Sequence, residues 1–473
     1  MAYSHSDRLS ALDATFLAIE STNVHMHVGT VGIFAAGPLR SDGGGLDMAR
    51  IRDLAEPALR ENARFRQRLE RVPVFDHWAW VDDARFDLDY HLRHTSLPEP
   101  GDVRQLKRLA GRIFSQKLDR GRPLWEMWFV EGLADGRFAV ITKVHHCMID
   151  GISGVDLLAG FVQTSADARE RSTSARFVPR PAPGPRQLFA DELAHRASLP
   201  LRAAAGGLQL LRQPRRTLER MGHTTAAVGH ALGAGFGSAS ETPFNQDIGP
   251  HRRFDWARMD LADVKEVKGR FGGTVNDVVL AVTAGALRQF LLRRAVSVDE
   301  LDFHVMMPVN VRGEDQRGKL GNRVASVRAR LPVDVHDPGR RMARVIEETR
   351  RLKGSDLVEG TELLETLSDF TATSLFAQLA RLSTLTRSYN LTVTNVPGPQ
   401  APVDLLGARM EEVYPLVPLF SNQGLGIALF SYDQGLFWGF DADWDALPDL
   451  HDLVGAVQEE LERLRKLEAP SRR

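Results

Sequence analysis

Cysteine is almost absent from the sequence. The single residue, Cys147, excludes an intramolecular disulfide framework and fits a protein of a reducing compartment. An excess of charge of either sign is also missing, because the 60 Lys and Arg residues are balanced by 61 Asp and Glu residues. The resulting net charge of −1 gives no electrostatic argument for a nucleic-acid partner.

Long apolar runs are missing as well. The opening residues (MAYSHSDRLSALD) contain no apolar signal region, and no stretch approaches the ~20 uninterrupted apolar residues of a membrane-spanning helix. The best candidate, residues 275–292, contains Asp277 and Arg288. We therefore expect a cytoplasmic protein whose contact with lipid is peripheral.

The length of 473 residues exceeds what one hydrophobic core usually holds, which predicts two domains. A hydrophobic content of 43% and a charged content of 26% are those of an ordinary globular protein. Helical and strand patterns occur in both halves, and this mixture predicts two α/β domains packed face to face. We place an N-terminal domain at 1–164, a linker at 165–242 and a C-terminal domain at 243–473.

Hydrophobic periodicity predicts the individual elements. In the N-terminal half we expect strands at 25–35, 125–130 and 137–144, and helices at 48–65, 106–118 and 151–164. An Asp135-Gly136 turn between two β-rich runs predicts a hairpin. In the C-terminal half we expect helices at 261–271, 275–294, 337–353, 360–382 and 448–467, and strands at 303–309, 323–331, 391–395, 409–417, 425–432 and 436–440.

The linker has a composition of its own. Residues 176–186 hold four prolines and predict an extended segment. Residues 201–213, bounded by Pro200 and Pro214, predict a short amphipathic helix. Basic residues surround it, namely Arg196, Arg202, Arg212, Arg215, Arg216 and Arg220. Such a helix can lie on an anionic lipid surface; the alternative is a solvated helix packed between the domains.

Two imidazoles stand where a predicted strand ends and a predicted helix begins. His145 and His146 follow the strand, and Asp150 and Gly151 follow the histidines. A neutral imidazole can take a proton from an alcohol near pH 7. A second pair, at 25 and 27, lacks a third ligand nearby, so we expect no metal site there.

The pattern HHxxxDG at 145–151 resembles the active-site signature of the CoA-dependent acyltransferase superfamily, which includes chloramphenicol acetyltransferase and peptide-synthetase condensation domains. Further stretches resemble the bacterial wax ester synthase/diacylglycerol acyltransferases, from about residue 9 to about residue 450. These stretches are Leu12-Asp13-Ala14, Met26-His27-Val28-Gly29, Pro123-Leu124-Trp125, Asn276-Asp277, Gly321-Asn322 and Asn395-Val396-Pro397. The match is loose only in the middle, at 165–240.

The resemblance implies two chloramphenicol-acetyltransferase-like α/β sandwich domains with the active site at their interface. It implies transfer of a long-chain acyl group from acyl-CoA, as co-substrate and without a cofactor, to diacylglycerol or a long-chain alcohol. His146 matches the general base and His145 a supporting position. Asp150 matches a carboxylate that holds the loop through an arginine, and Gly151 allows a tight turn.

The resemblance also suggests roles for the accessory motifs. Asn276 is the candidate donor to the oxyanion of the tetrahedral intermediate, with a helix N-terminus as the alternative explanation. Asp277 and the segment Pro123-Leu124-Trp125 are candidate substrate-binding residues, although Trp125 also suits a core anchor. Asn395 is a further candidate, with a strand-end turn as the alternative.

Two other functions and one other mechanism compete with this interpretation. A condensation enzyme would use carrier-bound acyl groups, but the chain has no carrier domain. A non-catalytic lipid-surface protein would not need a paired imidazole. A nucleophilic Cys147 is disfavoured because neighbouring residues of a strand point to opposite faces. We expect association with the inner membrane or lipid inclusions to be peripheral.

Overall fold

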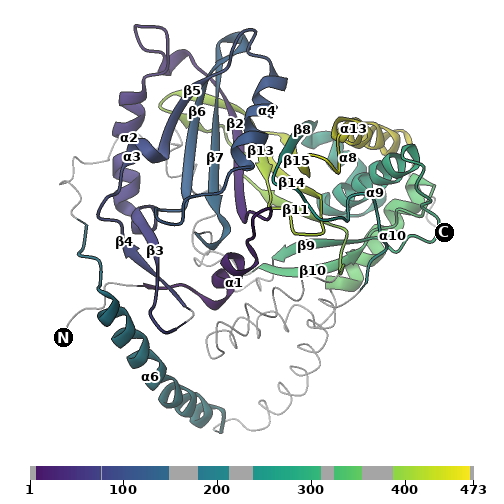
Figure 1. Cartoon of the computed structure of the whole chain (residues 1–473). Helices are drawn as coiled ribbons and strands as arrows, with labels where there is room; N and C mark the ends of the chain where they lie inside the picture. The colour runs from purple at the N-terminus through teal and green to yellow at the C-terminus, as the bar shows by residue number, and fades with distance from the viewer. Residues whose placement is uncertain are drawn as a thin grey trace.

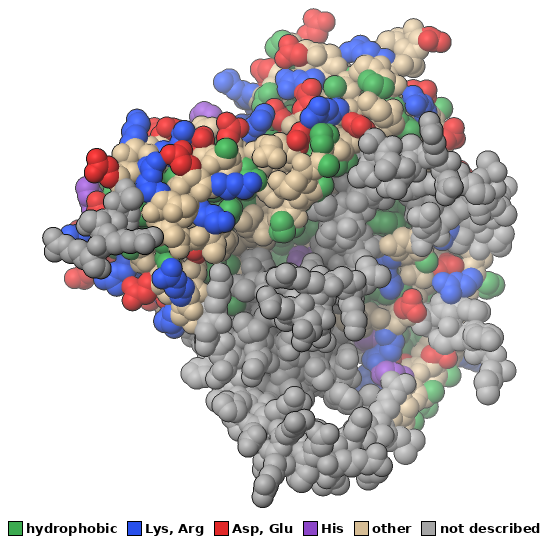
Figure 2. All heavy atoms as spheres, turned by 180° about the vertical axis from the view of Figure 1, so that it is seen from behind, with side chains coloured by type: hydrophobic (Ala, Val, Ile, Leu, Met, Phe, Trp, Pro, Cys, Tyr) green, Lys and Arg blue, Asp and Glu red, His purple; other side chains and the backbone are tan. Residues whose placement is uncertain are grey.

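The computed structural model describes residues 7–75, 77–148, 179–211, 238–310, 324–353 and 387–468. Figure 1 shows two lobes side by side, each built on a sheet with helices against it. The predicted α/β class with two domain-like halves is therefore confirmed. Basic and acidic side chains are interspersed over the described part of the face in Figure 2, in keeping with the neutral composition.

The N-terminal lobe contains most of the first half of the chain. Its helices are α1 (Ala11–Ile19), α2 (Met48–Glu61), α3 (Leu88–His91) and α4 (Val103–Phe114), with short 3-10 helices η1 (Gly37–Leu39), η2 (Ala63–Arg66), η3 (Ala134–Gly136) and η4 (His146–Met148). Its strands are β1 (Asp7–Arg8), β2 (His27–Ala35), β3 (Gln67–Arg71), β4 (Trp78–Asp82), β5 (Leu92–Ser96), β6 (Trp125–Leu133) and β7 (Arg137–His145).

The C-terminal half supplies helices α8 (Leu261–Phe271), α9 (Val275–Arg293), α10 (Pro338–Lys353) and α13 (Leu450–Lys466). Its strands are β8 (Arg252–Asp260), β9 (His304–Asn310), β10 (Val324–Arg330), β11 (Leu391–Pro397), β12 (Asp404–Leu405), β13 (Ala408–Leu416), β14 (Leu425–Tyr432) and β15 (Gly435–Asp443). The predicted helix at 360–382 lies outside the described residues.

Two six-stranded sheets organise the lobes. The C-terminal sheet has the order β10-β9-β11-β14-β15-β8, in which β11 is parallel to both of its neighbours. The N-terminal sheet has the order β12-β13-β2-β7-β6-β5. Two strands from the C-terminal half thus extend the N-terminal sheet, because β13 pairs antiparallel with β2. A third, small sheet joins β1, β4 and β3.

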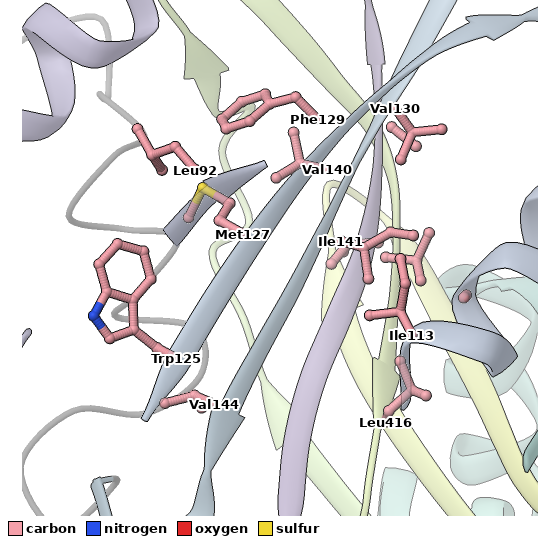
Figure 3. Packing of buried hydrophobic residues seen from close by; sticks show 14 of the residues in the cluster. Leu92, Ile113, Trp125, Met127, Phe129, Val130, Val140, Ile141, Val144 and Leu416 are labelled. Atoms are coloured by element: carbon pink, nitrogen blue, oxygen red, sulfur yellow. The ribbon is translucent and has the colours of Figure 1, made fainter. Parts of the chain in front are cut away.

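Each large sheet has its own hydrophobic core. Trp125, Phe129 and Phe138 are among the largest fully buried side chains of the N-terminal core, and Figure 3 shows several of its members around β6 and β7. In the C-terminal core α9 is packed deeply. Among the described residues α9 is the one helix long and apolar enough to span a membrane, and 72% of its apolar stretch is buried inside the protein.

The linker helix differs from the sequence prediction. We predicted a helix that starts at 201, after Pro200, whereas α6 already begins at Pro185 and runs continuously over Pro185–Leu211. Proline normally breaks a helix because it lacks an N–H and clashes with the preceding turn. Here the turns before Pro200 are held by tertiary packing: Phe189 stacks on Phe75 with ring centroids 5.5 Å apart, and Leu188 is buried against the β3–β4 hairpin. Tertiary packing overrides local preference.

Other boundaries moved for local reasons. The strand predicted at 25–35 begins at His27. It is the second strand of the chain, because the short β1 comes before α1. The helix predicted at 106–118 begins earlier, at Val103, because Asp102 and Gln105 form a capping box at its start. The helix predicted at 48–65 ends at Glu61, and η2 follows it.

The two sheets approach each other closely at Gly439 of β15. A Cβ atom placed on this glycine would lie 1.8 Å from the carbonyl oxygen of Pro415 in β13. Only glycine fits here without moving the backbone of one sheet away from the other. This contact links the C-terminal sheet to the strand that completes the N-terminal sheet.

We predict that Gly439→Ala destabilises the protein by at least the ~1–3 kcal/mol usual for overpacked sites, because the obstructing atom belongs to the backbone. Thermal and denaturant unfolding measure the effect. The matched control is Gly455→Ala in α13, where a new Cβ meets nothing within 4 Å and helix propensity favours alanine by about 1 kcal/mol. A Gly439→Ala protein as stable as the wild type would contradict the close approach.

Candidate active site

The histidine pair lies where β7 ends. His145 is the last residue of β7, and His146 is the first residue of η4. The His145 amide donates to the Leu124 carbonyl over 2.9 Å, and the His146 amide donates to the Met26 carbonyl over 2.7 Å. Backbone hydrogen bonds to the neighbouring segments on both sides therefore fix the position of the two histidines.

The two imidazole rings lie in different surroundings. The His145 side chain is 1% exposed, and its ring meets the edge of His27 with centroids 6.0 Å apart. The half-buried His146 ring stacks on Phe16 of α1 at 3.9 Å. Adjacent side chains at a strand end point apart, so one ring faces the protein interior while the other packs on α1.

Burial sets the charge of both rings. It lowers the pKa of His146 to about 4, and the neighbouring His145 lowers it further. Burial also lowers the pKa of His145, although the nearby Glu20 opposes the change. Both imidazoles are therefore neutral at pH 7, the form in which a histidine accepts a proton. Within the described ranges, Nδ1 of His146 has no hydrogen-bond partner.

An ion pair beside the histidines, in which the carboxylate is buried and the guanidinium is partly exposed, was not found by sequence reasoning. Oε1 of Glu20 lies 3.6 Å from Nε2 of His145, and Oε2 lies 2.6 Å from Nη2 of Arg120. Arg120 also donates to the Leu17 carbonyl of α1. No local pattern indicates these contacts, because Glu20 and Arg120 are 100 positions apart in the sequence.

The His146 turn borders the junction of the two lobes. Met26, whose carbonyl binds the His146 amide, belongs to a small apolar cluster with Val24 of the N-terminal half and with Ile248 and Leu419 of the C-terminal half. Arg252 crosses the same junction, since its guanidinium donates to the Asn23 carbonyl. The histidines thus lie at the interface that the sequence resemblance implied.

The segment Pro123-Leu124-Trp125 is bound to the histidine pair through the Leu124 carbonyl. All three side chains are buried. Trp125 donates its indole N–H to the Phe65 carbonyl over 2.8 Å and stacks on His91 at 4.5 Å. Figure 3 shows Trp125 within the core beside Val144 and Met127. The described contacts support the core-anchor alternative for Trp125, and substrate contact by this segment stays a prediction.

Asn276 and Asp277 lie in the first turn of α9, as the sequence predicted. The N-cap is Thr274, so Asn276 does not cap the helix with its side chain. Asp277 accepts the Thr274 amide over 2.7 Å and the Thr349 hydroxyl of α10 over 2.7 Å. Asp277 therefore ties two helices together. Across the described ranges, no hydrogen bond, ion pair or ring contact joins either residue to the histidine pair, and their proposed roles stay predictions.

The remaining candidates lie elsewhere in the structure or outside its description. Asn395 is half-buried near the end of β11, where it pairs with Leu429 of β14. Asp150, Gly151, Gly321-Asn322 and the helix predicted at 151–164 lie outside the described residues. In the part of the chain that is described, no group of three or more His, Cys, Asp or Glu side chains is arranged to hold a metal ion.

Two surface cavities of about 210 and 220 Å³ lie away from the histidine pair. The first is lined by α6 and the β3–β4 hairpin, including Leu188 and Glu192. The second lies at the far end of the N-terminal sheet, beside Gly45 and Glu131. None of the residues predicted to form the site lines either cavity.

Cys147 directly follows His146 but is 2% exposed and packs in the N-terminal core. Burial raises the pKa of its thiol well above the usual value, and the carboxylate of Asp13 adds to the rise. A thiol that stays protonated is a poor nucleophile. The geometry therefore favours direct transfer between two substrates over an acyl-cysteine intermediate.

Comparison with known proteins assigns the chain to a class. Residues 9–279 match the family model of the wax ester synthase/diacylglycerol acyltransferase catalytic domain, and residues 320–465 match the WS/DGAT C-terminal domain. The protein is therefore an acyltransferase. Since the two matches span most of its length, the chain belongs to the wax ester synthase/diacylglycerol acyltransferase family.

Individual relatives agree with the family. A putative diacylglycerol O-acyltransferase of Mycobacterium tuberculosis is 35% identical over 97% of this chain and 90% of its own length. One of Mycobacterium bovis is 32% identical over 97% of this chain and 96% of its own. The wax ester synthase/diacylglycerol acyltransferase of Marinobacter aquaeolei VT8 has a similar structure, with a TM-score of 0.66, 26% identity, and coverage of 97% and 98% of the two chains.

The fold is shared more widely. The starter condensation domain of rhizomide synthetase aligns with a TM-score of 0.55 and 12% identity, over 99% of this chain and 95% of its own. At that identity the likeness concerns the fold alone. The expected chloramphenicol-acetyltransferase-like architecture is thus confirmed.

We predict that Cys147→Ala keeps most of the acyltransferase activity, because the thiol is buried and protonated. Intact-mass measurement after incubation with acyl-CoA should show no acyl adduct on the wild-type protein. An acyl group covalently attached at Cys147 would overturn this expectation, and Cys147→Ser provides a second, isosteric comparison.

Proposed function

We propose that the protein transfers a long-chain acyl group from acyl-CoA to diacylglycerol, to a long-chain alcohol, or to both, with His146 as general base. The observation that carries the proposal is a neutral imidazole anchored at the junction of the two lobes. The names of the relatives support diacylglycerol as acceptor, and the name of the Marinobacter enzyme adds wax ester synthesis.

In the proposed reaction His146 removes the proton from the acceptor hydroxyl as the oxygen attacks the thioester carbonyl. A tetrahedral intermediate forms, and its collapse breaks the carbon–sulfur bond and releases the CoA thiolate. The imidazolium of His146 then returns the proton to the departing sulfur. One histidine thus acts first as base and then as acid, and the acyl group passes directly to the alcohol.

The other predicted residues support this chemistry in the proposal. Asn276 would donate to the oxyanion, a contribution that typically amounts to a few kcal/mol. Asp150 would hold the loop after the base through an arginine, and Gly151 would let that loop turn. Asp277 and Asn395 would line the substrate path from the C-terminal half.

We predict that His146→Ala lowers turnover by at least the ~10²–10⁴-fold usually attributed to general acid–base catalysis. The assay follows ester product from one acyl-CoA with either diacylglycerol or a fatty alcohol, side by side, and circular dichroism confirms the fold. The pH dependence gives a second measurement. Since burial lowers the pKa of His146 to about 4, kcat/KM should stay level from about pH 5.5 to 7.5.

Two results would contradict the role of His146. The first is a folded His146→Ala protein with near-normal ester formation. The second is a kcat/KM that falls by half as the pH drops through 6.5, the ordinary value for an imidazole, because a base with a pKa of about 4 loses activity only near that lower pH. If neither acceptor gives ester, the substrate assignment fails independently of the base.

We further propose that the protein works in the cytoplasm and associates peripherally with the inner membrane or with lipid inclusions. The acceptors are apolar, and the arginines around 196–220 suit an anionic lipid surface. Two exposed apolar side chains lie on α6 and on the β3–β4 hairpin against which it packs. Leu193 of α6 is 52% exposed, and Val74 of the hairpin is 89% exposed. Apolar contact and positive charge together favour adsorption to a lipid surface more than either does alone.

We predict that the double variant Val74→Asp/Leu193→Asp lowers the fraction of protein that floats with phosphatidylcholine vesicles containing phosphatidylglycerol. The control is Leu292→Asp, since Leu292 is 49% exposed but lies at the end of α9 in the other lobe. Vesicles without phosphatidylglycerol test the charge contribution. Equal flotation of the double variant and the control, or no flotation of the wild type, would contradict the proposal.

A further inference from the structure

The carboxylate of Glu20 lies directly beneath the turn that carries His146. Glu20 is the C-cap residue of α1, and its side chain is only 4% exposed. Its two oxygens face different partners. Oε1 lies 3.6 Å from Nε2 of His145, and Oε2 lies 2.6 Å from the guanidinium of Arg120. The Met26 amide also points to Oε1 over 3.4 Å.

The backbone around His146 assigns the proton on the His145 ring. The Cys147 amide donates to Nδ1 of His145 over 3.2 Å. A neutral imidazole carries its proton on one nitrogen only, so Nδ1 is unprotonated and Nε2 carries the proton. The protonated nitrogen is the one that faces Glu20. At 3.6 Å the contact is electrostatic rather than a full hydrogen bond, and it is buried, where such contacts are strengthened.

The Cys147 amide is one of two backbone anchors that flank the base. The His146 amide is held by the Met26 carbonyl, and the next amide is held by the His145 ring. Together the two hydrogen bonds hold the amides on both sides of the His146 side chain. If the His145 proton moved to Nδ1, two N–H groups would face each other and the second anchor would be lost.

Arg120 keeps the carboxylate charged and in place. Its guanidinium also donates to the Leu17 carbonyl over 3.0 Å, which attaches it to the last turn of α1. Burial alone would raise the pKa of Glu20, but contacts with His145 and Arg120 outweigh burial and lower the pKa to about 2. The negative charge is therefore present throughout the range in which an ester synthase is assayed.

We propose that Glu20 is a positioning residue for the base: its carboxylate, held by Arg120, keeps the proton of His145 on Nε2, so that Nδ1 can anchor the Cys147 amide and fix the orientation of His146. This rests on the proposed role of His146 as general base. Glu20 touches neither substrate nor the reacting atoms; it acts through His145 and the backbone.

The test compares Glu20→Ala and the isosteric Glu20→Gln with wild type. We expect Glu20→Ala to lower kcat by on the order of 10²-fold, the cost associated with displacing a catalytic group by about 1 Å, with a KM for acyl-CoA within about threefold of normal. Glu20→Gln should fall between the two, because its amide oxygen can still present a partial negative charge to Nε2 but no full charge. If Glu20→Ala does not fold, Glu20→Gln carries the comparison.

A spectroscopic measurement separates positioning from simple loss of stability. Nitrogen-15 shifts of imidazole-labelled histidine distinguish a protonated from an unprotonated ring nitrogen, and the His145 signals are assigned by their absence in His145→Gln. In the wild type we expect Nε2 protonated. In Glu20→Ala and Glu20→Gln we expect a mixture of both tautomers. This readout needs no turnover, so it is independent of whether His146 is the base.

The matched control is Glu460→Gln in the C-terminal lobe. Glu460 is fully buried and pairs with the guanidinium of Arg341, as Glu20 pairs with Arg120. This variant should lower the melting temperature but leave kcat and the His145 signals unchanged. The proposal is overturned if Glu20→Gln keeps the wild-type tautomer, or if the Glu20 variants lose no more kcat than Glu460→Gln at the same loss of stability.

Discussion

The antiparallel pairing of β7 between β2 and β6 determines where both histidines lie. In this register His145 is opposite His27 of β2, and the backbone of 124–127 runs along the other side. A slip of one residue would exchange the faces of every side chain on β7. His145 would then leave its position opposite His27 and turn to the other face of the sheet. The register of a single strand therefore decides that His145 is buried beside His27 while His146 packs on Phe16 of α1.

The same face of β7 carries a buried charge that helps to hold the strand in place. Lys143, two residues before His145, is 1% exposed and donates to the carbonyls of Ile113 and Gln116 at the end of α4. A cation at a helix C-terminus is favourable because the last carbonyls lack helical partners. These hydrogen bonds connect α4 to β7, the strand that leads to the histidine pair. The carboxylate of Glu126 lies 3.8 Å from the Lys143 ammonium group.

Sequence reasoning found what local patterns encode. The hairpin of β6 and β7, the N-terminus of α9 at Thr274 and the strand ending at His145 all follow from periodicity and turn chemistry. Contacts between distant segments were not predictable in this way. Glu20 and Arg120 carry no motif that joins them, and no local pattern indicates that Phe16 stacks on His146. The passage of α6 through Pro200 depends on packing against the β3–β4 hairpin. The pairing of β13 with β2 likewise requires knowledge of the whole fold.

The pairing of β13 with β2 has a consequence for the order of synthesis. β2 is made early, yet the strand that covers its free edge ends at Leu416 of a 473-residue chain. During translation the N-terminal sheet therefore presents β2 as an unpaired edge until β13 has left the ribosome, and such edges invite pairing with other chains. The nascent protein consequently has a long interval in which chaperone binding would protect it, and an isolated N-terminal half would remain permanently in that vulnerable state.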